Sequence, residues 1–177
     1  MSAICRVITG VSGSPRNLPA LRYAAALARG HAATLIPVLA WVLPGGEVAD
    51  RRYPSSSYLR REWERDAWGR LHDALGTAIG GIPADVTAEP FVIRGQPGPV
   101  LVHAASRAGD LLVIGTGRHG AAGRLAAGKV SRYCLARATC PVLAVPPASL
   151  ELQAGHGLHR WAFRRRGLTL SELTAGR

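Results

Sequence analysis

Two short glycine-rich segments carry the residue types best suited to binding an anion. The first, residues 9–14 (TGVSGS), leaves backbone N–H groups free just before a predicted helix. The second begins at residues 115–120 (GTGRHG) and continues to residues 128–131 (GKVS), so that Arg118 and Lys129 accompany its glycines. Close backbone approach together with cationic side chains suits a polyphosphate. The sequence therefore predicts a phosphate-binding site, although an ordinary tight turn is an equally simple interpretation of the first segment.

The second segment comes close to the P-loop of nucleotide hydrolases without matching it. Gly123, Gly128 and Lys129 have suitable spacing, but Val130 stands where a Ser or Thr should reach Mg²⁺. A P-loop also begins directly after its strand, whereas Gly123 lies well beyond the predicted strand end at Gly115. We therefore interpret this partial match as a coincidence.

Catalytic and metal-binding patterns are not found. The sequence shows no Ser-His-Asp set, no paired carboxylates and no metal-ligand cluster with suitable spacing. Of the three cysteines, Cys134 and Cys140 have no activating base nearby in sequence and are predicted to be buried, inert thiols. His119 is expected to be a solvent-exposed loop residue, with phosphate contact as the alternative. We expect neither catalysis nor a bound metal.

Apolar segments and amphipathic segments alternate along the chain. The predicted strands are residues 5–11, 33–42, 85–93, 110–115 and 141–145, and the predicted helices begin near Ser14, Tyr58, Val100 and Lys129. Residues 43–57, rich in Pro, Gly and Ser, are expected to form a loop. This order predicts an α/β fold with a doubly wound, mainly parallel five-stranded sheet and helices on both faces. Ligands of such sheets bind at the carboxyl ends of the strands, where the strand order reverses.

Three residues set expectations for individual elements. Pro37 is unfavourable in a central strand because it has no N–H to donate, and Pro90 favours an edge position for residues 85–93. Ser14 is predicted to be the N-cap of the first helix, with a proline at the first helical position.

Length and composition favour one folded domain. The chain has 177 residues, of which 47% are hydrophobic and 19% charged. We expect a domain over residues 1–148 and a basic, irregular and poorly ordered C-terminal tail over residues 149–177. The sequence shows neither a signal peptide nor an apolar run long enough to span a membrane. Its cysteine usage suits a reducing compartment, so we expect a cytoplasmic protein.

The net charge of +11 comes almost entirely from arginine, since Lys129 is the only lysine. Clustered arginines can neutralise nucleic-acid phosphates. Here they are scattered, apart from short clusters at residues 51–52, 60–61 and 164–166. A solvated, arginine-biased surface is therefore the favoured interpretation, and nucleic acid is not the expected partner.

The order and spacing of these segments resemble the universal stress protein family. Residues 110–131 followed by residues 140–145 (CPVLAV) are similar to the C-terminal half of these proteins. Residues 93–97 (IRGQP) resemble their V-x-G-x-P element, and residues 11–14 (VSGS) stand where they carry V-D-G-S. The resemblance covers residues 4–147 and implies a Rossmann-like fold similar to the adenine nucleotide alpha-hydrolases.

The same resemblance implies a function. It indicates a stress-response regulator that binds ATP or another adenine nucleotide at the carboxyl ends of the parallel strands. It also implies a homodimer formed through the last strand, residues 141–145. The implied nucleotide-binding residues are Gly10, Val11, Ser12, Gly13, Ala40, Gly115, Gly117, Arg118, His119, Gly120, Gly128, Lys129, Val130 and Ser131.

Three positions depart from the residues of the ATP-binding members, two of them within their G-x₂-G-x₉-G-[ST] pattern and one in the earlier V-D-G-S element. Arg118 stands at the second glycine and Lys129 at the Ser/Thr, while Ser12 replaces an acidic residue that helps to hold the nucleotide and its metal. A Cβ at position 118 opposes close backbone approach, but the added cations and the lost carboxylate favour phosphate binding without a metal.

The sequence leaves two uses of this cleft open. One is retained binding of ATP or another nucleotide, and the other is a cleft that is empty or used differently. The alternative function is accordingly a nucleotide-independent, dimeric interaction module of the same fold. A ligase that releases pyrophosphate is less favoured, because residues 12–14 lack the second Gly and the Asp of the Ser-Gly-Gly-x-Asp-Ser loop.

Overall fold

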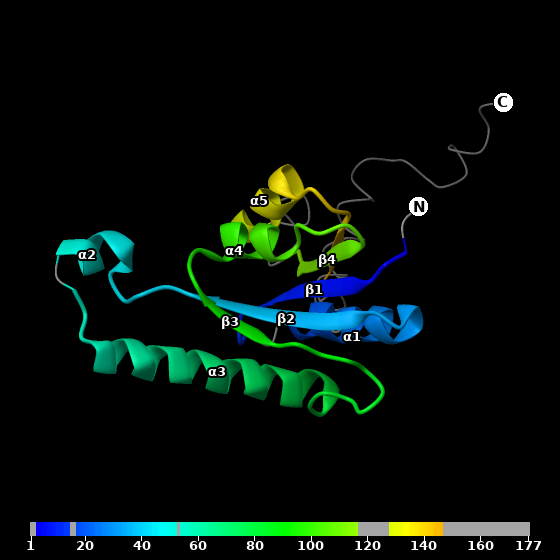
Figure 1. The fold of residues 1–177 in the computed structure, drawn as a ribbon, viewed down its shortest axis with the longest axis horizontal. Helices are drawn as coiled ribbons and strands as arrows, with labels where there is room; N and C mark the ends of the chain where they lie inside the picture. The colour runs from blue at the N-terminus through cyan, green and yellow to red at the C-terminus, as the bar shows by residue number, and fades with distance from the viewer. Residues whose placement is uncertain (1–2, 15–16, 53, 117–127, 147–177) are drawn as a thin grey trace, which may run out of the picture.

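The computed structural model describes residues 3–14, 17–52, 54–116 and 128–146, and these form a five-stranded sheet flanked by helices (Figure 1). The strands are β1 (Arg6–Val11), β2 (Thr34–Trp41), β3 (Phe91–Arg94), β4 (Asp110–Gly115) and β5 (Val142–Val145). The helices are α1 (Leu18–His31), α2 (Gly46–Arg52), α3 (Ser57–Ile79), α4 (Pro97–Ala104) and α5 (Lys129–Arg137). All strand pairs are parallel, which confirms the predicted fold class.

Helices cover both faces of the sheet. Helices α1 and α3 lie on one face and α4 and α5 on the other (Figure 1). The strand side chains alternate accordingly: Leu39 of β2 packs with Leu71 of α3, whereas Ile36 of the same strand packs with Leu101 of α4. Continuous apolar strands such as β4 are explained by this burial on both sides.

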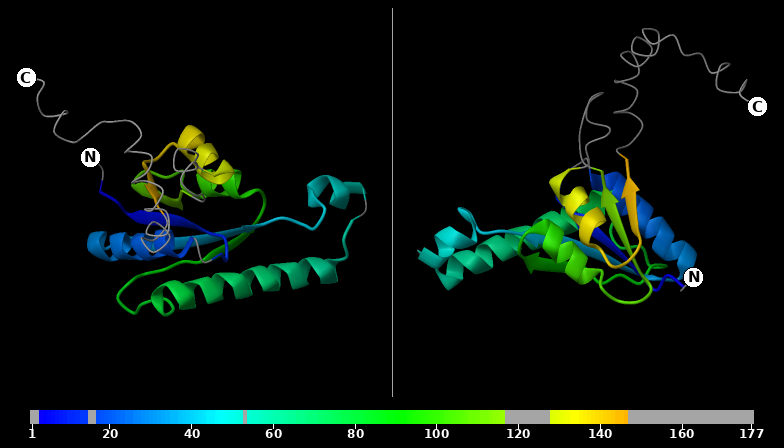
Figure 2. Two further views of the ribbon diagram at one scale, coloured as in Figure 1. Left: turned by 180° about the vertical axis from the view of Figure 1, so that it is seen from behind. Right: turned by 90° about the horizontal axis from the view of Figure 1, so that it is seen from above.

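The strand order β3-β2-β1-β4-β5 reverses between β1 and β4. From β1 the chain turns into α1 on one face, and the segment after β4 leads to α5 on the other face. These two connections therefore diverge at the carboxyl ends of two neighbouring strands, the place where doubly wound sheets bind ligands. Strand β5 lies at the far edge beside β4 (Figure 2).

Pro37 lies in a central strand, contrary to what its chemistry favours, and its neighbours show why it is tolerated. The Leu35 N–H donates to Thr87 O, so Leu35 and the alternate residue Pro37 direct their backbone groups toward the β3 side. On that side the β3 ladder begins only at Val38 opposite Phe91. The missing N–H thus falls in a gap between an isolated bridge and the start of the ladder.

Three expectations for single elements were wrong. Residues 43–57 are not all loop, because α2 forms there and is followed at Ser57 by α3. Helix α1 begins at Leu18 rather than after Ser14, and its N-cap is Asn17. The predicted strand over residues 85–93 is shorter at its start, with β3 beginning at Phe91, although its edge position is confirmed.

Helix α2 and the first half of α3 extend beyond the sheet (Figure 1). Asp50 of α2 holds them together: its carboxylate accepts the Ser55 N–H at 2.8 Å, and lies 2.9 Å from Arg60 and 3.2 Å from Arg94. Helix α3 is capped at both ends, by the Ser56 hydroxyl, which accepts the Leu59 N–H, and by Gly80 at φ 72°.

The predicted tail, residues 149–177, lies outside the described residues. Within the part of the chain that the structure describes, every helix is too short or too polar to cross a membrane.

Candidate functional site

Asn17 joins the carboxyl ends of β1 and β4. Its Nδ2 donates a hydrogen bond to the carbonyl of Gly10. Its Oδ1 lies 2.9 Å from where a Cβ on Gly115 would be, so any larger residue at position 115 would displace it. Asn17 is not among the site residues predicted from the sequence, where its only signal is an Asx residue directly before a helical pattern, which usually indicates an N-cap.

The β1–α1 turn presents small polar groups and a left-handed glycine. Gly13 has φ +67°, a conformation that side chains rarely adopt. The hydroxyls of Ser12 and Ser14 lie 3.0 Å apart, and Ser12 is exposed. This turn therefore offers hydroxyl groups and backbone N–H groups but no carboxylate.

The N-terminus of α5 is fixed against the end of β4. The buried Ser131 hydroxyl donates to Gly115 O at 2.8 Å, and the Gly128 N–H donates to Thr116 O at 3.2 Å. Because the Ser131 hydroxyl proton is donated to Gly115 O, Ser131 positions the start of α5 against the end of β4. Lys129, at the first position of this helix, is exposed.

The N-termini of α1 and α5 are both uncapped by side chains. Asn17 turns its amide to Gly10 instead of to α1, and Gly128 has no side chain to offer. Neither helix has an acidic residue in its first turn. Two helix N-termini with positive dipole ends and no side-chain cap thus begin at the connections after β1 and β4, an arrangement that favours an anion. In α1, Pro19 leaves the second helical position without an N–H, so α5 offers more backbone donors.

The other predicted site residues have various placements. Val11 is buried on the α1/α3 face, Val130 packs on the α4/α5 face, and Ala40 is half-buried at the end of β2. A Cβ at Gly10 would lie 2.8 Å from Leu101 Cδ1, so this glycine is also needed for α4 to pack. Gly117, Arg118, His119 and Gly120 lie outside the described residues.

Metal-ligating and nucleophilic groups are scarce near these turns. Within the described ranges no three His, Cys, Asp or Glu residues gather so as to hold a metal ion. Cys134 is fully buried and Cys140 half-buried, and burial raises the pKa of both thiols. Both cysteines are therefore poor nucleophiles, as the sequence predicted.

The strand order and the helices on both faces define a doubly wound α/β protein, in which two helix N-termini begin at the carboxyl edge of the sheet. The chain belongs to the universal stress protein family: the model of that family matches residues 4–146. A curated relative, the universal stress protein in the QAH/OAS sulfhydrylase 3′ region of Thermus aquaticus, is 30% identical over 140 residues, which are 78% of this chain and 96% of that protein.

Solved structures agree with this assignment. A universal stress protein crystallised with cAMP is 28% identical, has a TM-score of 0.52 and aligns over 83% of this chain and 100% of its own. The universal stress protein of Archaeoglobus fulgidus in complex with dAMP is 17% identical, with a TM-score of 0.53 over 81% of this chain and 98% of its own. The second likeness shows the fold alone.

Proposed function

We propose that this universal stress protein is a non-enzymatic stress-response regulator that binds an adenine nucleotide at the carboxyl ends of β1 and β4. The observation that carries the proposal is the pair of side-chain-uncapped helix N-termini, on α1 and α5, at the point where the strand order reverses. Left-handed Gly13 and crowded Gly115 keep the adjoining backbone free of side chains. Together these features suit a phosphate group.

The nucleotide class is supported by a relative. The 28% identical universal stress protein was crystallised with cAMP. Since the two chains share the fold over nearly all of the described residues, an adenine nucleotide is the ligand that we favour. Among adenine nucleotides ATP is the one to test first, because the altered motif is the one with which other family members bind ATP.

We propose that the phosphates are bound without a metal ion. Residues 10–14, 115–116 and 128–131 contain no carboxylate, and Ser12 stands where the family carries an acidic residue. Lys129, exposed at the start of α5, would supply the positive charge beside the helix N–H groups.

The protein is also proposed to form a homodimer through β5 and to reside in the cytoplasm. Strand β5 is an edge strand of the sheet that the described residues form, and its alternate backbone groups point away from β4, where a second copy would pair with them. All three cysteines are unpaired, which fits a reducing compartment.

Two measurements test the nucleotide proposal. Mass spectrometry of the small molecules released from the purified full-length protein should detect an adenine nucleotide. In calorimetry, Lys129→Ala should weaken ATP binding about tenfold, because a charge-assisted hydrogen bond is lost.

Arg107→Ala is the matched control, since Arg107 is an exposed cation beside the amino end of β4, at the opposite edge of the sheet. It should leave ATP affinity unchanged. Equal losses in both variants would reduce Lys129 to a contributor to overall charge. Neither a co-purified nucleotide nor binding heat at sub-millimolar ATP would overturn the proposal and favour the nucleotide-independent interaction module.

A further inference from the structure

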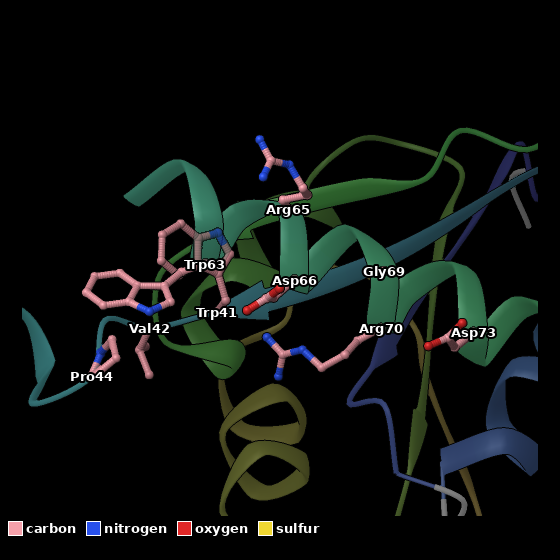
Figure 3. Close-up of a pocket in the computed structure, with 9 residues that line it drawn as sticks. All are labelled: Trp41, Val42, Pro44, Trp63, Arg65, Asp66, Gly69, Arg70 and Asp73. Carbon is pink, nitrogen blue, oxygen red and sulfur yellow. The ribbon is translucent and has the colours of Figure 1, made fainter. Parts of the chain in front are cut away.

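A groove of about 590 Å³ lies between the end of β2 and helix α3 (Figure 3). Trp41 and Pro44 line one wall, and Trp63, Asp66 and Arg70 line the other. Sites for small molecules typically measure roughly 300–1,000 Å³ and combine aromatic walls with a few polar groups. The volume of this open groove falls within that range, and its lining combines aromatic side chains with exposed charged ones.

One wall of this groove is formed by a face of helix α3 that does not pack against the sheet. Its buried residues, Ala67, Leu71, Ala74, Leu75 and Ala78, pack against the sheet. The groove residues of the same helix include Trp63, Asp66, Arg70 and Asp73, which recur every three or four positions and so form a separate stripe. In Figure 3 the side chains of Asp66 and Arg70 extend from this stripe into the same space.

The groove is separate from the proposed nucleotide site. Trp41 points to the α1/α3 face, where it packs with Leu71. The preceding residue Ala40, which belongs to the predicted nucleotide site, points to the opposite face because side chains alternate along a strand. The two sites are nevertheless neighbours, since the aliphatic part of Arg70 lies beside Gly13 of the β1–α1 turn.

The charges in the groove are available to a ligand. Arg65 is already paired with Glu62 at 2.6 Å. Among the described residues, Arg70, Asp66 and Asp73 have no ion-pair partner within salt-bridge distance. The groove therefore combines indole faces, carboxylate acceptors and one free guanidinium donor.

We propose that this groove binds a planar heteroaromatic ring that carries an amino group, as guanine does. The ring would stack on Trp63, as bases stack on aromatic side chains. The Asp66 carboxylate would accept two hydrogen bonds from adjacent N–H groups on one edge of the ring, and Arg70 would donate to acceptors on another edge. This second site goes beyond the adenine-nucleotide function and uses none of its residues.

Guanosine is the probe, because it lacks a phosphate and so cannot rely on the helix N-termini. Titrated into the full-length protein, it should quench tryptophan fluorescence saturably. Asp66→Asn should weaken this binding about tenfold, because a hydrogen bond to a charged group is lost. Glu64→Gln, an equivalent change at an exposed α3 position that does not line the groove, should leave it unaltered.

Two comparisons make the test specific. Adenosine should bind about tenfold more weakly than guanosine, since its ring nitrogen N1 is an acceptor that would face the Asp66 carboxylate. Trp63→Leu should abolish the saturable quenching while circular dichroism shows a folded protein. Absence of saturable quenching in the wild type, equal affinity for the two nucleosides, or unchanged binding in Asp66→Asn would each overturn the proposal.

Lys129→Ala distinguishes the groove from the nucleotide site. It should weaken ATP and leave guanosine binding unchanged. If it weakens both, guanosine occupies the nucleotide site and the groove proposal is wrong. If ATP does not bind but guanosine binding depends on Asp66, the groove proposal stands and the nucleotide function does not.

Discussion

Asp110 organises the amino-terminal edge of the sheet through a single buried carboxylate. Arg6 donates to its two oxygens at 2.7 and 2.6 Å, and the backbone N–H of Arg107 donates to one of them at 2.8 Å. The hydrogen bonds that Arg6 donates to the Asp110 carboxylate raise the pKa of Arg6. Because the Asp110 side chain is fully buried, this pair joins β1 to β4 at the edge opposite the candidate site.

Replacing Asp110 with Ala should lower the free energy of unfolding by about 3–5 kcal/mol, since it leaves the Arg6 charge without its partner. Urea denaturation provides the measurement. The matched control is Asp85→Ala, which breaks a solvent-exposed pair with Arg29 and should lower the free energy of unfolding far less, because solvent screens that pair. Similar losses in the two variants would contradict the importance of burial.

Asp50 gives the stability of the protein a defined acid dependence. Hydrogen bonds from Ser55, followed by the charge of Arg60, lower the pKa of Asp50 to about 2. In the unfolded chain an aspartate titrates near ~3.9. Stabilisation from Asp50 is therefore complete above the unfolded value and is lost as the pH falls toward 2.

The variant Asp50→Asn should thus be less stable than wild type at pH 7, and this difference should shrink steadily between about pH 4 and pH 2. Thermal unfolding followed by circular dichroism across this range tests it. A difference that is constant with pH would show that the Asp50 charge is not the source of the stabilisation.

At the scale of elements, the sequence predicts a strand well where both of its faces are buried. It predicts helices less well where turn-forming residues lie at or near their ends. The sequence predicts a strand at residues 110–115 because a strand that is buried on both faces appears as a short, continuous apolar run. Helix α2 was missed because glycines before it and Pro54 after it resemble a loop, whereas the structure holds it through Asp50. The sequence misplaces the start of α1 because Ser14 and Asn17 are equally good N-caps by residue type, and the proline directly after Ser14 favours the earlier position.

The outer edge of strand β5 is the proposed dimer interface, and a single substitution there tests it. Pro141 O accepts the N–H of Leu112 in β4, and Val145 O accepts that of Thr116 directly after β4, so the alternate residue Ala144 directs its N–H away from β4. Ala144→Pro should remove this outward donor, leave the β4 ladder intact, and convert the proposed dimer to a monomer in light scattering. Ala144→Val is the control and should remain dimeric; a dimer in both variants would place the interface elsewhere.

At the scale of the whole molecule, the two edges of the sheet have different roles. The amino edge is fixed by the Arg6–Asp110 pair, while the carboxyl edge has side-chain-uncapped helix ends, small residues and no carboxylate in its turns. Gly13, Gly115 and Lys129, which the sequence names as candidate site residues, all lie at this carboxyl edge, and the site itself stays a prediction. The sequence does not indicate Asn17 or the α3 groove, because both depend on contacts between segments that are distant along the chain.

The most direct test of the central claim is a calorimetric titration of the full-length protein with ATP, performed with and without Mg²⁺. We predict saturable binding at sub-millimolar ATP whose affinity does not increase when Mg²⁺ is added, because the turns described at the site contribute no carboxylate. Absence of binding in both titrations, or binding that requires Mg²⁺, would contradict a metal-free nucleotide site at the carboxyl ends of β1 and β4.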